Sequence, residues 1–144
     1  MAKRLNIRAC ANEGIKALAA LETWLAGNFD GKLLELVRRR ASQINGCAFC
    51  QHISSEKPQK LEEFDNRLLL LNVWRKFDFF SPRERAALAW TEALTLVAGN
   101  EAPDEVYEEV SREFSDDELV ALSIAIGMIN VWNRLSIGFQ DEDA

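Results

Sequence analysis

The sequence is poor in the residues that build most metal sites and disulfide scaffolds. Its 144 residues include one histidine, His52, and three cysteines. A zinc site needs four protein ligands, or three and a water molecule, drawn mainly from these two residue types. Small secreted domains held together by disulfides need several cysteine pairs. A disulfide scaffold is therefore not expected, and a metal centre is only a weak alternative.

An excess of positive charge is also missing, because the formal net charge is -6 and the isoelectric point is near 4.9. Nucleic-acid binding depends on a dense basic surface, so this function is not expected. The local exception is the run of arginines at 38–40, which we interpret as a solvated helix face rather than a phosphate site.

Long apolar runs are missing as well. The N-terminus, MAKRLNIRAC, lacks the apolar core of a signal peptide. The longest apolar run, Leu119–Trp132, is shorter than the roughly 20 residues of a membrane span and contains Ser123 and Asn130. We expect a cytoplasmic protein without a membrane partner.

Glycine and proline are few, with seven and three residues, and apolar residues recur at spacings of three and four. This pattern predicts an all-α chain, of a length that suits one domain over residues 1–144. After an irregular segment at 1–11, the expected helices are Glu13–Ala26, Lys32–Ile44, one from Cys47 that ends before Pro58, Leu61–Lys76, Pro82 to about Ala98, Asp104–Phe114, and one from Ser115 to about Ile137.

Several helix ends carry local signals. Ser81 and Ser115 each precede a glutamate by three residues, which is the spacing of a capping box. Asn12 is the expected cap of the first helix, and Gly27-Asn28 is expected to end it in a left-handed conformation. The last helix is apolar nearly all round, so we expect it to be buried on several sides, in part by a second copy of the chain.

The clearest motif is a Cys-x-x-Cys pair, Cys47 and Cys50, directly after Gly46 at an expected helix start. Cysteines three residues apart share a helix face and can form a disulfide, and a helix N-terminus stabilises the reactive thiolate. Redox chemistry is the favoured interpretation, with metal binding and an inert buried pair as alternatives. Cys10, in the irregular segment, is interpreted as a small apolar filler.

Glu35 lies twelve residues before Cys47 on a mostly apolar helix. It could pair with Arg38 or Arg39 in a surface contact of little energetic value. Alternatively, its flanking leucines place it half inside the core, where it could accept a proton from a thiol. The sequence alone does not distinguish these alternatives.

The segment LLELVRRRASQINGCAFC resembles the signature of the AhpD-like alkylhydroperoxidases, in the carboxymuconolactone decarboxylase superfamily. The resemblance covers roughly residues 5–138. The signature combines a glutamate twelve residues before the first cysteine, the CxxC pair, and a histidine four residues after the second cysteine. Glu35, Cys47 and Cys50 match it.

The resemblance implies an all-helical homo-oligomer, often a trimer or hexamer, with thiol peroxidase activity and no metal or haem. Cys50 would attack an alkyl hydroperoxide and become a sulfenic acid, which Cys47 would convert to a disulfide. A dithiol, a lipoyl-type protein in the best-known relatives, would reopen it at the more exposed sulfur, taken to be Cys47. Glu35 would feed the proton relay that deprotonates Cys50.

The chain departs from the signature where Ser54 stands in the position of the histidine. A hydroxyl passes a proton along a hydrogen-bonded chain but has no pKa near 7 with which to hold one, so weaker turnover is expected. His52 lies roughly 200° around the helix from Cys50 and is not expected to substitute. Pro58 and Glu62-Glu63 also differ from the usual small residues of this segment.

Two other functions stay open. A helical oligomer that has lost activity, acting as a redox sensor or assembly module, is favoured by Ser54 and Pro58. Lactone decarboxylation is implied by the superfamily name, but that branch does not rely on a CxxC pair, and the chain has no separate acid–base histidine.

Overall fold

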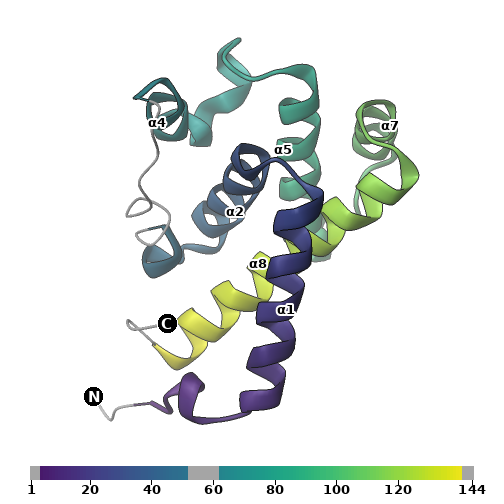
Figure 1. Cartoon of the computed structure of the whole chain (residues 1–144). Helices are drawn as coiled ribbons and strands as arrows, with labels where there is room; N and C mark the ends of the chain where they lie inside the picture. Colours follow the sequence, from purple (N-terminus) through teal and green to yellow (C-terminus); the bar gives the residue numbers. More distant parts are fainter. Residues whose placement is uncertain (1–3, 52–61, 141–144) are drawn as a thin grey trace.

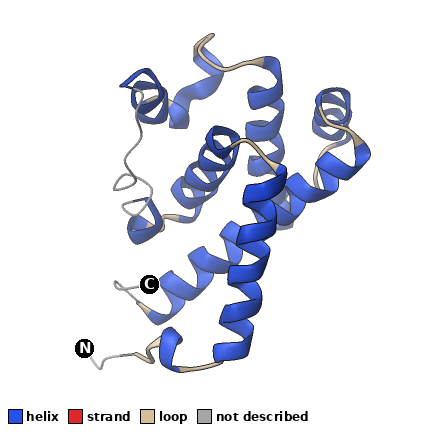
Figure 2. Ribbon diagram, viewed as in Figure 1, coloured by secondary structure: helices blue, strands red, loops and turns tan. Residues whose placement is uncertain are grey.

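The computed structural model describes residues 4–51 and 62–140, which are helical with no strand among them (Figure 2). This confirms the all-α prediction for the described part of the chain. The elements are η1 (Ile7–Ala9), α1 (Asn12–Asn28), α2 (Gly31–Asn45), α4 (Glu62–Leu69), η2 (Leu71–Lys76), α5 (Pro82–Thr95), α6 (Val97–Asn100), α7 (Asp104–Glu113) and α8 (Asp116–Phe139). Residues 48–51 form a further helical turn.

Helix α2 lies at the centre of the molecule, between α5 and α8 (Figure 1). Its apolar residues reach three separate groups of buried side chains. Leu33 and Val37 belong to the group shared with α5, α7 and α8, Leu36 to the group shared with α4, η2 and α5, and Leu34 to the group shared with α1 and α8. Because α2 is enclosed on most sides, the residues in its middle are buried or half-buried.

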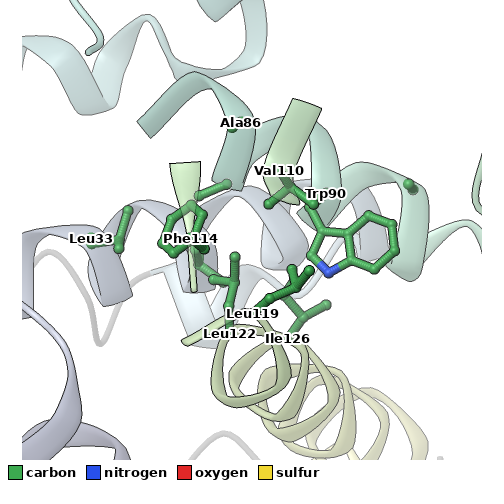
Figure 3. Close-up of a cluster of buried hydrophobic side chains, with 11 residues drawn as sticks. Leu33, Ala86, Trp90, Val110, Phe114, Leu119, Leu122 and Ile126 are labelled. Carbon is green, nitrogen blue, oxygen red and sulfur yellow. The ribbon is translucent and has the colours of Figure 1, made fainter. Parts of the chain in front are cut away.

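The largest of these groups joins four helices around Trp90 and Phe114 (Figure 3). Leu122 and Ile126 of α8 contribute from one side and Val110 of α7 from another. The Trp90 indole N–H donates to Ser123 Oγ over 2.9 Å, so the polar atom of this side chain is satisfied. This cluster fixes α8 against the α2–α5 pair.

Both predicted capping boxes are present. Ser81 Oγ accepts from the Glu84 N–H over 3.1 Å, and Glu84 Oε2 accepts from the Ser81 N–H over 3.0 Å. Ser115 and Glu118 make the same pair of bonds at the start of α8. The hydrogen bond from the Ser115 N–H and the Arg83 guanidinium lower the pKa of Glu118. These signals are local, so they could be identified without knowledge of the fold.

The ends of α1 were predicted incorrectly. Asn12 lies inside the helix rather than capping it, and the preceding residue, Ala11, has a left-handed conformation with φ 49°. At the other end α1 includes Gly27 and Asn28, and Phe29 follows in an extended conformation. The Asn28 side chain donates to the Trp24 carbonyl over 2.8 Å, which satisfies a helix-end acceptor without a left-handed residue.

Two expected long helices are each divided in the structure. The helix predicted over 61–76 is α4 followed by the 3₁₀ helix η2, with non-helical angles at Val73. Leu68, Leu71 and Trp74 are buried, whereas Leu69 is 78% exposed. The helix predicted to reach Ala98 ends at Thr95, and α6 follows after Leu96.

Helix α8 has the length and apolarity of a membrane span, a property it shares with core helices of soluble folds. It packs against α2, α5 and α1, which accounts for much of its apolar surface. The expected burial on several sides is incomplete in the single chain, because Val120, Ile124 and Val131 are exposed. The helix ends at Phe139, two residues beyond the predicted end near Ile137.

Candidate functional site

The two cysteines of the CxxC motif are joined by a disulfide on the helical turn that follows α2, with Cα atoms 5.4 Å apart. Gly46 ends α2 with φ 68°, a conformation that glycine adopts readily, and redirects the chain. The Cys47 N–H donates to the Ser42 carbonyl over 3.0 Å, which anchors the turn to the end of α2. The local sequence Asn-Gly-Cys therefore positions the sulfur pair.

The two sulfurs differ in environment. Cys47 is buried, at 1% exposure, and its Sγ accepts a hydrogen bond from the Cys50 N–H over 3.3 Å. Cys50 is half-buried and lines a pocket. The expectation that Cys47 is the more exposed sulfur is therefore wrong, because Cys47 sits at the start of the turn, directly against α2.

Glu35 is buried, at 4% exposure, and lines the same pocket as Cys50. Its Oε1 lies 3.7 Å from Arg39 Nη2, one helical turn further along α2. Within the described residues, Glu35 Oε1 and Arg39 Nε have no hydrogen-bond partner. Each alternative for Glu35 is therefore confirmed in one respect. The residue pairs with an arginine, as in the first, and it lies inside the protein, as in the second. The unpartnered oxygen is itself buried, so the structure holds a hydrogen-bond acceptor whose capacity is unused among the described residues.

The pocket has a volume of about 760 Å³ and lies between η1, α1, α2, α8 and the cysteine turn. Most of the lining surface is apolar, as in small-molecule sites, but half of the fourteen lining residues have polar or charged side chains. The lining residues are Ile7, Arg8, Asn12, Ile15, Lys16, Ala19, Glu22, Glu35, Arg38, Phe49, Cys50, Ile129, Trp132 and Ser136.

The three arginines at 38–40 do not form the solvated face that was expected. Each is half-buried and pairs with a carboxylate: Arg38 with Glu22 on α1, Arg39 with Glu35 on α2, and Arg40 with Glu92 on α5. Glu22 also accepts from the Trp132 indole N–H over 3.1 Å, so it links α1, α2 and α8 beside the pocket. These pairs hold the wall of the site together.

Three residues of the sequence prediction, His52, Ser54 and Pro58, lie outside the described residues. The roles assigned to Ser54 and His52 stay predictions, as do those of Cys47, Cys50 and Glu35. Cys10 is a free cysteine and is exposed, so its interpretation as an apolar filler is wrong. Among the described residues, no three His, Cys, Asp or Glu side chains lie close enough together to hold a metal ion.

The sequence prediction missed part of the pocket wall. Ile7 and Arg8 come from a segment that was expected to be irregular, and Glu22 reaches Arg38 across 16 positions of the chain. Arg39 follows Glu35 by four residues, a spacing that signals an ion pair, but its burial depends on the packing of α2. Contacts between distant segments leave no local pattern in a sequence.

A model of the "Carboxymuconolactone decarboxylase family" matches residues 11–93. The uncharacterised protein YdfG of Bacillus subtilis is 34% identical over 145 aligned positions, which cover 100% of this chain and 99% of YdfG. A solved structure from Agrobacterium tumefaciens, of unknown function and named for a suggested role as the antioxidant defence protein AhpD, is 34% identical with a TM-score of 0.84 over 97% of each chain. The debrominase Bmp8 shares the fold, at 20% identity and a TM-score of 0.73 over 87% of this chain and 68% of Bmp8.

Proposed function

The chain belongs to the carboxymuconolactone decarboxylase family and is AhpD-like, and from this we propose that it is a thiol-dependent peroxidase that reduces alkyl hydroperoxides through Cys47 and Cys50. The observation that carries the proposal is the shared pocket of Cys50 and Glu35, in which the buried carboxylate has an oxygen without a hydrogen-bond partner among the described residues. A cysteine of the CxxC pair and a buried carboxylate therefore line the same pocket.

In the first step, Glu35 accepts the proton of the Cys50 thiol, either directly or through a water or hydroxyl chain that includes Ser54. The Cys50 thiolate attacks the terminal oxygen of the hydroperoxide, and the O–O bond breaks. The oxygen stays on Cys50 as a sulfenic acid, and the alkoxide takes up the proton and leaves as an alcohol. The half-buried position of Cys50 supports this assignment, because the pocket gives a substrate access to it.

In the second step, the Cys47 thiol attacks the sulfur of the Cys50 sulfenic acid and the S–O bond breaks. The disulfide forms, and the hydroxyl leaves as water with the proton that the Cys47 thiol gives up. The two sulfur atoms come close enough for this step, because they are joined by a disulfide in the structure. Two electrons from an external dithiol, of the lipoyl type, then return both cysteines to thiols.

Because Cys47 is buried, we propose that the reductant attacks the Cys50 sulfur of the disulfide. An incoming thiolate reaches Cys50 through the pocket, forms a mixed disulfide there and releases Cys47 as a thiolate. The hydrogen bond from the Cys50 N–H to Cys47 Sγ would stabilise that thiolate and make it the better leaving group. This differs from the expectation, stated above, that Cys47 is attacked.

The proposal is tested by following the consumption of cumene hydroperoxide with dihydrolipoamide as the reductant. We expect turnover to be lost in Cys50→Ser and in Cys47→Ser, and to fall by about 100-fold in Glu35→Gln, the size of effect typical of general acid–base catalysis. The matched control is Cys10→Ser, since Cys10 is exposed and is not part of the pocket lining. If the wild-type protein neither consumes the hydroperoxide nor cycles its disulfide, the proposed function is wrong.

The assignment of the two sulfurs needs a separate experiment. In Cys47→Ser, one equivalent of hydroperoxide should leave a sulfenic acid on Cys50, which dimedone traps and peptide mass spectrometry locates. In the same way, a mixed disulfide with a small thiol should form at Cys50 when the oxidised wild-type protein is quenched early. A mixed disulfide found at Cys47 would refute the proposed direction of attack.

A further inference from the structure

The pocket carries more positive charge than the protein as a whole would suggest. Three of its lining residues are cationic, Arg8, Lys16 and Arg38, in a chain with a formal net charge of -6. Arg38 is neutralised by Glu22, and the other acidic lining residue, Glu35, is paired with Arg39. Arg8 and Lys16 have no ion pair with any described residue, so they are the unbalanced charges of the site.

Along α1, these two cations lie away from the part of the pocket that contains Glu35. Lys16 and Glu22 are six residues apart on α1, which places them roughly 9 Å apart along the helix axis. Arg8 lies on η1, which leads into the Lys16 end of α1. Glu22 marks the Glu35 part of the pocket, because it bonds to Arg38, and Arg38 lies one turn from Glu35 on α2.

Much of the rest of the pocket surface is apolar. Ile15 of α1 and Ile129 and Trp132 of α8 line it, and Phe49 contributes from the cysteine turn. The polar edge of Trp132 is bound to Glu22, so its ring is left to provide apolar surface. A volume of about 760 Å³ accommodates a molecule of fatty-acid size.

We propose that the preferred substrates are hydroperoxides of organic acids, such as fatty-acid hydroperoxides, whose carboxylate binds to Arg8 and Lys16 while the peroxide reaches Cys50. The proposal rests on the proposed peroxidase function for the reaction, and on charge complementarity for the ligand. The apolar wall takes the hydrocarbon chain, and a neutral hydroperoxide of similar size lacks the contact with the cations.

The test compares the hydroperoxide of linoleic acid with that of its methyl ester, which differ in the anionic group. We expect kcat/KM to be about tenfold higher for the acid, the effect of two exposed charge contacts, and this preference to fall as salt is added. Arg8→Gln and Lys16→Gln should each reduce the preference about threefold, and together they should abolish it. The matched control is Lys32→Gln, since Lys32 is exposed on α2 and is not part of the pocket lining.

A binding measurement separates this inference from the peroxidase reaction. Titration calorimetry with octanoate, with octan-1-ol as the neutral probe, should show saturable binding of the anion that the Arg8→Gln/Lys16→Gln variant weakens about tenfold and Lys32→Gln leaves unchanged. Equal kcat/KM for acid and ester, or equal binding of octanoate by the wild type and the double variant, would overturn the anion site. Binding of octanoate without turnover of any hydroperoxide would instead support the site and refute the proposed peroxidase function.

Discussion

Glu92 joins three parts of the scaffold that holds the site, and its removal gives a prediction that can be worked out from the structure. Its Oε1 accepts from Arg40 Nε of α2 over 2.8 Å and from the Trp74 indole N–H of η2 over 2.9 Å, and its Oε2 accepts from Arg75 Nη1 over 2.5 Å. Arg40 follows Glu35 on α2, so this carboxylate helps to hold the helix that carries the proton acceptor.

We expect Glu92→Gln to reduce the free energy of unfolding by about 3 kcal/mol at pH 7. The amide can still accept from Trp74, but it loses the charge that strengthens both arginine bonds. Arg40 is half-buried and would be left without a counter-ion, whereas Arg75 is largely exposed and contributes little. Most of the expected loss therefore comes from the Arg40 contact.

The stability difference between the wild type and Glu92→Gln should become smaller as the pH falls. Burial alone would raise the pKa of Glu92, but hydrogen bonds from Trp74, Arg75 and Arg40 outweigh it and lower the pKa below its ordinary value of 4.5. A carboxyl whose pKa is lower in the folded state stabilises the fold fully above its unfolded pKa, and this contribution is lost as the pH falls through the folded pKa. The difference between wild type and Glu92→Gln should thus be constant from neutral pH down to about pH 5.5 and shrink below about pH 4.5.

The assay is urea unfolding followed by helical circular dichroism, at a fixed protein concentration and at several pH values. The control is Glu109→Gln on α7, an exposed glutamate that should change stability by less than about 0.5 kcal/mol. A loss below about 1 kcal/mol at pH 7, or a loss that does not shrink in acid, would refute the assigned role of the Glu92 contacts.

Two further predictions concern turnover and assembly. Ser54→His restores the residue type that the AhpD-like signature has at this position and should raise the rate of hydroperoxide reduction several-fold near neutral pH; an unchanged rate in a folded variant would show that Ser54 does not occupy the relay position. Val120, Ile124 and Val131 leave an apolar face of α8 exposed, and we propose that a second copy of the chain covers it. Ile124→Glu should then reduce the mass measured by light scattering to that of a smaller species, whereas Glu109→Gln should not; a wild-type monomer would refute this proposal.

The sequence alone determined the features that depend on neighbouring residues. The two capping boxes each follow from a few adjacent side chains and backbone groups, and both are present. The resemblance to the AhpD-like signature likewise implied that Glu35 and the cysteine pair belong to one site, and Glu35 and Cys50 line one pocket.

Only the tertiary structure decided how these groups are exposed. Cys47 and Cys50 are equivalent in a motif, but Cys47 is buried because it lies against α2, and Cys50 is left facing the pocket. Glu35 is buried because α2 is enclosed by three groups of apolar side chains, and the ion pair between Glu22 and Arg38 joins helices that are far apart in the chain. Burial and contacts between distant segments depend on the packing of whole helices, and no short stretch of sequence contains that information.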